Sequence, residues 1–184
     1  MSDVTVTASE RPFSGKLSNI RVDTVRFADG SQAEREIVEH PDAVAVVALD
    51  AQGRVLLLRQ YRHPVGERLL ELPAGKLDRQ GEDPADAARR ELEEETGWSA
   101  GRLDPLLSFH NSAGWTDEGT TLYLADDLRE TGTPDGFTAA HEEADMEVVW
   151  VPLDEAVAMV AAGEIRDAKT VIGILLTRLQ RGVH

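Results

Sequence analysis

Three glutamates are spaced so that they could act together in the run Arg-Glu-Leu-Glu-Glu-Glu-Thr, residues 90–96. In a helix, Glu91, Glu94 and Glu95 would lie on one side and Glu93 would point roughly the opposite way. Like charges at i,i+4 cost about 0.2–0.5 kcal/mol, and anions near a helix C-terminus cost roughly 0.3–1 kcal/mol more. A divalent cation would remove this conflict, and oxygen-only ligands suit Mg²⁺ or Mn²⁺. The cluster predicts a metal site; the alternative is a solvated acidic helix face.

The helix that would carry these glutamates has start and stop signals. Asp83 followed by Pro84 is typical of an N-cap and a first helical position. Gly97 occupies the position of a left-handed C-terminal cap. Ala88 and Leu92 would form the apolar stripe beside the glutamates. We therefore expect a short helix between Asp83 and Gly97 that packs on a core along this stripe.

Hydrophobic alternation and turn signals predict an N-terminal β region followed by a mixed α and β region. Residues 1–12 are expected to form a loose polar arm, and an Asp-Gly pair at residues 29–30 predicts a hairpin. The expected strands are residues 17–27, 32–40, 43–49, 54–61, 106–109, 119–125 and 146–152, and residues 69–72 lead into the segment that carries the glutamates. Two further helices are expected at residues 154–162 and 167–181.

Composition limits the classes of function. The 184 residues suffice for one sizeable core, and a hydrophobic content of 41% is ordinary for a soluble globule. A formal net charge of −15 argues against partners such as nucleic acid or an anionic membrane, because both need a positive footprint. The absence of cysteine excludes disulfides and thiol redox chemistry. No signal-peptide core or membrane-length apolar run is visible, so we expect a cytoplasmic protein with no membrane partner.

The segment around the glutamates matches a known pattern. It reads GKLDRQGEDPADAARRELEEETGW from Gly75 to Trp98 and resembles the Nudix box, G-x5-E-x7-R-E-U-x-E-E-x-G-U, where U is a bulky apolar residue. The fixed positions are filled by Gly75, Glu82, Arg90, Glu91, Leu92, Glu94, Glu95, Gly97 and Trp98. Six residues rather than five separate Gly75 from Glu82, which lengthens a loop upstream of the helix and leaves the role of Glu82 open.

Flanking segments narrow the resemblance. Three segments outside the helix resemble the corresponding parts of ADP-ribose pyrophosphatases of the Nudix superfamily: Arg59–Gly75, Ser112–Glu118 and His141–Ala156. This implies an α/β (α+β) fold, a Nudix-type α/β/α sandwich with a mixed β-sheet in residues 41–184. It also implies that residues 1–40 form an antiparallel β subdomain used for homodimer formation and for part of the adenosine site. The implied reaction is metal-dependent hydrolysis of a nucleoside diphosphate sugar, ADP-ribose, to AMP and ribose 5-phosphate.

The resemblance assigns metal ligands and a residue that supports them. Glu91, Glu94, Glu95 and the backbone carbonyl of Ala74 would hold Mg²⁺, with Mn²⁺ as the alternative ion. Arg90 would pair with a neighbouring carboxylate and fix its orientation, so Arg90 and Glu94 are also counted as catalytic. The alternative for Arg90 is an ordinary ion pair on the helix surface.

Arginines near the box could bind phosphate, since a guanidinium can donate two parallel hydrogen bonds to phosphate oxygens. Arg62 is the first choice, and the alternative is a surface arginine that supports Glu67 or Glu71. Arg59 is a second candidate, or it pairs with an acid inside the fold.

Adenosine recognition is expected from other parts of the chain. Arg35 and Glu36 are candidate cross-subunit contacts, although an exposed polar strand edge would explain them equally well. Glu118 is a candidate ribose or diphosphate contact. Stacking surfaces for adenine are available at Trp115, Tyr61, Phe27 and Arg21, whereas Trp98 and Trp150 lie in patterns typical of core.

A general base is expected in the segment that follows Gly132–Gly136. The resemblance places a catalytic glutamate there, able to close over substrate and polarise the attacking water. Glu142 is preferred and Glu143 comes second; the alternative is that these acids keep a loop soluble. Two rival functions stay open: a Nudix hydrolase of another diphosphate, such as a sugar nucleotide, NADH or an oxidised nucleotide, and a ligand-sensing module without turnover.

Overall fold

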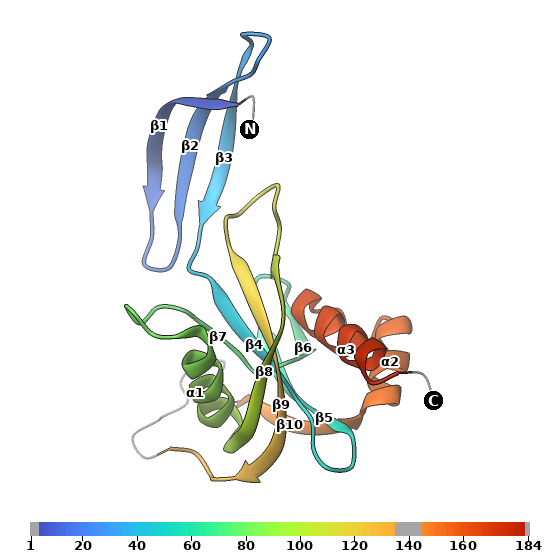
Figure 1. Ribbon diagram of the computed structural model, residues 1–184. Coiled ribbons are helices and arrows are strands. Elements are labelled where there is room, and N and C mark those ends of the chain that lie inside the picture. Colours follow the sequence, from blue (N-terminus) through green and yellow to red (C-terminus); the bar gives the residue numbers. More distant parts are fainter. Residues whose placement is uncertain (1–3, 135–144, 183–184) are drawn as a thin grey trace. The chain divides into compact units, whose positions relative to one another are not determined.

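The computed structural model describes residues 4–134 and 145–182 (Figure 1). The chain divides into two compact units, which are considered separately. One unit comprises Met1–Asp42 and His110–Gly119, and the other comprises Ala43–Phe109 and Thr120–His184.

The first unit contains a three-stranded antiparallel sheet in the order β1-β2-β3. Its strands are β1 (Thr5–Ser14), β2 (Asn19–Arg26) and β3 (Gln32–Glu39). The predicted hairpin of β2 and β3 is confirmed, but the expectation of a loose arm at residues 1–12 is wrong. Backbone pairing with β2 orders β1, while all ten of its side chains are exposed, so no hydrophobic face marks this strand in the sequence.

The second unit contains a mixed four-stranded sheet in the order β7-β4-β9-β8, in which β4 runs parallel to β9 and antiparallel to β7. These strands are β4 (Ala43–Ala48), β7 (Ala74–Lys76), β8 (Trp98–His110) and β9 (Gly119–Glu130). A second, antiparallel sheet has the order β10-β5-β6. Its strands are β5 (Arg54–Arg62), β6 (Glu67–Glu71) and β10 (Glu147–Pro152).

Strand β4 separates two hydrophobic cores. Ala45 and Val47 face a core shared with α2 (Leu153–Ala161) and α3 (Ala168–Gln180). Val44 and Val46 face the opposite core, which packs against α1 (Pro84–Thr96). Successive side chains of a strand point to opposite faces, and all four of these are fully buried. Figure 1 shows α1 on one side of β4 and the other two helices on the opposite side, so the predicted α/β/α sandwich is confirmed.

Helix lengths also bear on membrane insertion. Among the described residues, no helix is long and apolar enough to cross a membrane.

Candidate active site

Helix α1 begins and ends at the predicted signals. The Asp83 side chain accepts a hydrogen bond from the Ala85 amide at 2.8 Å, with Pro84 as the first helical residue. Gly97 closes the helix with a φ of 71°, and its amide donates to the Glu93 carbonyl. The helix is held against the core by Leu92, which is fully buried. These contacts fix the direction in which the acidic side of the helix faces.

Arg90 connects three carboxylates on and beside this helix. Its Nε and Nη2 donate to the two oxygens of Glu82 at 2.9 and 3.0 Å. Its Nη1 donates to Glu91 at 2.5 Å and to Glu94 at 3.0 Å. The hydrogen bond from Arg90 holds the pKa of Glu82 below its ordinary value. Arg90 therefore contacts the neighbouring carboxylates as expected, and Glu82 is the partner that it grips with two hydrogen bonds.

Strand β7 lies against the acidic side of α1. The Ala74 amide donates to the Glu95 carboxylate at 3.0 Å. At Gly75, a β-carbon would come within 1.9 Å of Cδ of Glu91, so only glycine fits beside that side chain. Burial raises the pKa of Glu91, and the hydrogen bond from Arg90 offsets the rise only in part. The structure thus brings together Glu91, Glu95 and the backbone at Ala74.

The predicted donor atoms are carboxylate oxygens and one backbone carbonyl oxygen, and a hard divalent cation prefers such oxygen ligands. Within residues 4–134 and 145–182, however, no group of three or more histidine, aspartate or glutamate side chains is already arranged to hold a metal ion. The glutamates instead contact Arg90 and the Ala74 amide. Glu91, Glu94, Glu95 and Ala74 therefore stay a predicted ligand set that matches the metal in chemistry.

Arg62 pairs with Glu71 in the way that the alternative interpretation describes. Its Nε and Nη2 each donate to one oxygen of Glu71 at 2.8 Å. The Arg62 side chain keeps 43% of its surface exposed, and Glu71 is the acceptor of both hydrogen bonds that its guanidinium donates within the described residues. The pKa of Arg62 is raised, chiefly by the hydrogen bond to Glu71 and further by the charges of Glu71, Glu95 and Asp167. Arg62 is therefore oriented near Glu95, and its phosphate contact stays a prediction.

Lys169, which the sequence did not single out, also contacts Glu71. Its Nζ donates to Glu71 at 2.7 Å and to Asp167 at 2.8 Å. Burial alone would raise the pKa of Glu71, but hydrogen bonds and charges from Arg62 and Lys169 outweigh it and leave the pKa below its ordinary value. The only sequence signal nearby is the helix cap at Asp167, which does not point to Lys169.

The other predicted residues that the structure describes belong to both units. Arg59 lies 3.7 Å from Glu147 in an exposed ion pair, so its partner is an acid at the surface rather than inside the fold. Arg35 and Glu36 are exposed on β3, and the Arg35 guanidinium lies 5.5 Å from the centre of the Phe27 ring. The Glu118 carboxylate lies 3.2 Å from the His40 ring. The two candidates for the general base, Glu142 and Glu143, fall outside the described residues.

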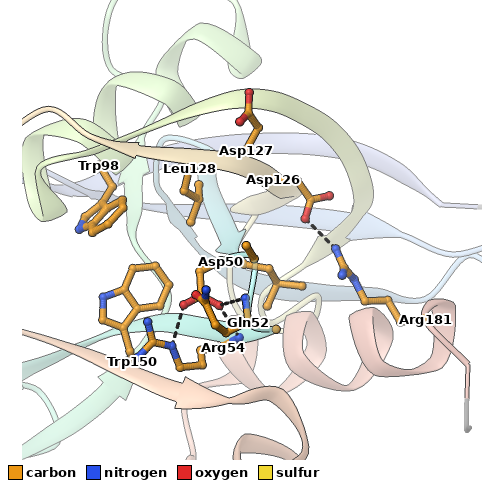
Figure 2. Close-up of a pocket in the computed structure, with 12 residues that line it drawn as sticks. Asp50, Gln52, Arg54, Trp98, Asp126, Asp127, Leu128, Trp150 and Arg181 are labelled. Carbon is orange, nitrogen blue, oxygen red and sulfur yellow. Dashed lines mark hydrogen bonds and ion pairs between the residues drawn. The ribbon is translucent and has the colours of Figure 1, made fainter.

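A separate hollow of about 630 Å³ opens beside the turn at residues 50–53 (Figure 2). Trp98 and Trp150 line it with their rings edge to face and their centroids 5.3 Å apart, and both rings pack against the α1 core as predicted. Charged side chains in this hollow are paired, as Arg54 is with Asp50 and Arg181 with Asp126. Of the predicted catalytic, substrate-binding and metal-binding residues that the structure describes, none lines this hollow, so it is not the candidate active site.

The fold and the site together define a class of protein. It is an α/β/α sandwich in which the capped helix α1 carries clustered glutamates beside β7, the strand that contains Gly75. Residues 39–172 match the family described as NUDIX domain. The chain belongs to the Nudix family. Members of this family generally require divalent metal ions, which agrees with the donor chemistry of α1.

Relatives cover nearly the whole chain. An ADP-ribose pyrophosphatase of Mycobacterium tuberculosis is 43% identical over 94% of this chain and 82% of its own length. An ADP-ribose pyrophosphatase of Bacillus subtilis is 38% identical over 96% of this chain and 94% of its own length. A methanol dehydrogenase activator of Bacillus methanolicus is also 38% identical, over 95% of this chain and 92% of its own length. A solved structure described as an ADP compounds hydrolase shares the fold, with a TM-score of 0.84, 22% identity and coverage of 98% and 95%.

Proposed function

We propose that the chain hydrolyses the diphosphate of ADP-ribose to AMP and ribose 5-phosphate. The observation that carries this proposal is the 43% identity to an ADP-ribose pyrophosphatase over 94% of the chain. The arrangement of α1 and β7 supports it, since Arg90 contacts Glu91 and Glu94, and Gly75 leaves the space that the Glu91 side chain occupies.

In this proposal Glu91, Glu94, Glu95 and the Ala74 carbonyl hold Mg²⁺, and Mn²⁺ can replace it. A metal held there would lower the pKa of a coordinated water and would neutralise the diphosphate. Arg90 keeps the carboxylates of Glu91 and Glu94 oriented through its three-way contact. The Ala74 amide keeps the Glu95 carboxylate oriented by donating a hydrogen bond to it.

The chain's own side chains would bind the substrate and move the proton. Arg62 presents to a phosphate the N–H groups that do not bind Glu71, and Arg59 lies on the same strand, β5. Arg35, Glu36 and Glu118 are proposed contacts to the adenosine and ribose parts. For the general base we propose the loop carboxylates in the order Glu142, then Glu143.

A homodimer is part of the proposal. Strand β1 is exposed along its whole length, and large apolar side chains lie uncovered on the first unit: Val6 at 55%, Phe13 at 54% and Leu17 at 52% exposure. A second copy that covers this surface would bury them. Light scattering at micromolar concentration should give twice the chain mass of 20.1 kDa, and a single chain mass would overturn the dimer.

Product analysis across a substrate panel tests the reaction. The panel contains ADP-ribose, ADP-glucose, GDP-mannose, NADH and an oxidised deoxynucleoside triphosphate, each with Mg²⁺, with Mn²⁺ and with EDTA. Fastest release of AMP from ADP-ribose, abolished by EDTA, would support the proposal. A faster reaction with another compound would reject ADP-ribose as the main substrate. Binding of ADP-ribose without turnover of any compound would favour the sensing module.

Two variants test the proposed base. Glu142→Gln should lower kcat much more than it weakens binding, whereas Glu143→Gln should leave most of kcat. If Glu143→Gln is the more damaging change, the assignment of the base moves to Glu143. Equal, small effects would remove the base from this segment.

A further inference from the structure

Glu71 is a buried carboxylate with three charge-assisted hydrogen bonds. Only 1% of its side chain is exposed. Both of its oxygens accept from Arg62, and one also accepts from Lys169. A buried carboxylate with this many donors has few ways to rotate, because any other rotamer would leave a desolvated charge unpaired. Glu71 therefore fixes the plane of the Arg62 guanidinium.

Lys169 ties this pair to the first turn of α3. Its second partner is Asp167, whose other oxygen caps α3 by accepting from the Thr170 amide at 3.0 Å and from the Thr170 hydroxyl at 2.6 Å. The Thr170 hydroxyl in turn accepts from the Leu72 amide at 2.9 Å. The start of α3 is thus joined to Glu71, the last residue of β6, and to Leu72, which follows it.

The same segment continues directly into the proposed metal site. The Pro73 carbonyl accepts from the Val46 amide at 2.9 Å, and the Ala74 amide donates to Glu95 at 3.0 Å. Every residue from Glu71 to Ala74 therefore has a polar group held by another element of the second unit. These contacts connect the Arg62–Glu71 pair, through four successive residues, with the backbone at Ala74.

We propose that Glu71 and Lys169 are positioning residues for the diphosphate reaction. Glu71 holds the Arg62 guanidinium so that the N–H groups that do not bind Glu71 meet a phosphate, and Lys169 holds Glu71 and joins it to α3. The inference rests on the proposed function, in which Arg62 contacts phosphate.

Charge balance explains why a lysine is needed at residue 169. Arg62 and Lys169 together neutralise Glu71 and Asp167, so the cluster has no net charge beside the glutamates of α1. Without Lys169, two carboxylates would share one guanidinium next to Glu95, and Arg62 would have several competing partners. Lys169 therefore keeps these carboxylates from competing with substrate for the N–H groups of Arg62 that do not bind Glu71.

A double-mutant cycle tests the proposal, because coupled residues give non-additive effects and independent ones give additive effects. The four proteins are the wild type, Lys169→Met, Arg62→Ala and the double variant, each measured for kcat and KM on ADP-ribose and for thermal unfolding. In the wild-type background, Lys169→Met should lower kcat/KM about 10-fold, as is typical for partners that orient a ligand-binding group. In the Arg62→Ala background it should change kcat/KM by less than about twofold.

Conservative and polar variants complete the design. Lys169→Arg, which keeps the charge, should restore most of the lost kcat/KM. Lys169→Gln replaces Lys169→Met in the cycle if the latter does not fold. A merely structural role would give the same factor in both backgrounds, and that result, or no effect of Lys169→Met at all, would overturn the proposal.

The wild-type measurement separates this inference from the proposed function. If the wild type does not hydrolyse ADP-ribose, this measurement alone rejects the proposed function, whatever the variants do. The cycle is then run with the panel compound that the wild type does hydrolyse or bind, and additivity decides the role of Lys169 in the same way.

Discussion

Gly75 lies so close to the Glu91 side chain that any side chain at residue 75 would displace Glu91. A β-carbon at Gly75 would lie 1.9 Å from Cδ and 2.2 Å from Oε1 of Glu91. The glycine is therefore required by the position of a carboxylate on another element, since its φ is not in the left-handed region. This close approach places β7 directly against the acidic side of α1.

Gly75→Ala should damage both stability and activity. Forcing a methyl group into this contact should cost about 1–3 kcal/mol of unfolding free energy, measured by urea denaturation, and should displace Glu91 enough to remove most turnover. Gly114→Ala is the matched control, because a β-carbon there meets no heavy atom within 4 Å. Comparable losses in the two variants would contradict the steric explanation.

Arg90→Lys tests the three-way carboxylate contact. A guanidinium can serve Glu82, Glu91 and Glu94 at once, whereas an ammonium group has neither the reach nor the planar geometry for it. We expect kcat to fall about 10–100-fold with the fold retained. Arg89→Lys is the control, since Arg89 is exposed and donates to the Ala100 carbonyl. Unchanged kcat in Arg90→Lys would rule out the orienting role.

Thr177→Val should stabilise the protein. Thr177 is fully buried in α3, and its hydroxyl has no hydrogen-bond partner within the described part of the chain. Replacing the hydroxyl by a methyl group of similar size should raise the free energy of unfolding by about 1 kcal/mol. Thr177→Ser, which keeps the hydroxyl and loses the methyl group, should instead be destabilising. A stability loss in Thr177→Val would show that the hydroxyl is hydrogen-bonded in solution.

Glu71→Gln should destabilise the protein in a pH-dependent way. The pKa of Glu71 in the folded state lies below its ordinary value of 4.5, so its ionised form adds stability that is fully present above about pH 4.5. That stability is lost as the pH falls through the folded-state pKa. The variant should cost about 3 kcal/mol at neutral pH, and the difference from wild type should shrink on acidification.

An exposed ion pair provides the comparison for Glu71. Glu147 lies 3.7 Å from Arg59, and its side chain is 66% exposed. Glu147→Gln should therefore change the free energy of unfolding by less than about 0.5 kcal/mol across the same pH range. A pH-independent loss in Glu71→Gln would contradict the assignment of a buried, ionised carboxylate.

Local signals were sufficient to predict α1 and the hairpin of β2 and β3. The cap residues Asp83 and Gly97 bound a helix whose apolar stripe is short but clear, and both ends are confirmed. Strand β1 was missed because its side chains are all exposed and its order comes from backbone pairing. Strand β8 is longer than predicted for a similar reason, since most of its side chains face solvent.

The site was predictable where its residues are close in sequence and not where they are distant. The glutamates and Arg90 lie within two turns of one helix, so spacing alone places them together. Glu71 and Lys169 are 98 positions apart, and only the packing of α3 beside β6 brings them into contact. For the same reason the sequence left open whether Arg62 contacts Glu71.

The central claim is that the glutamates of α1 hold the metal for diphosphate hydrolysis. Its most direct test is to measure how fast the Glu95→Gln variant releases AMP from ADP-ribose at different metal concentrations. The amide can still accept from Ala74, so the fold should be retained while the charge is lost. We predict that kcat falls at least about 100-fold across a Mg²⁺ titration, whereas Glu93→Gln on the opposite side of the helix stays close to wild type. Near-normal, Mg²⁺-dependent turnover in Glu95→Gln would contradict the account.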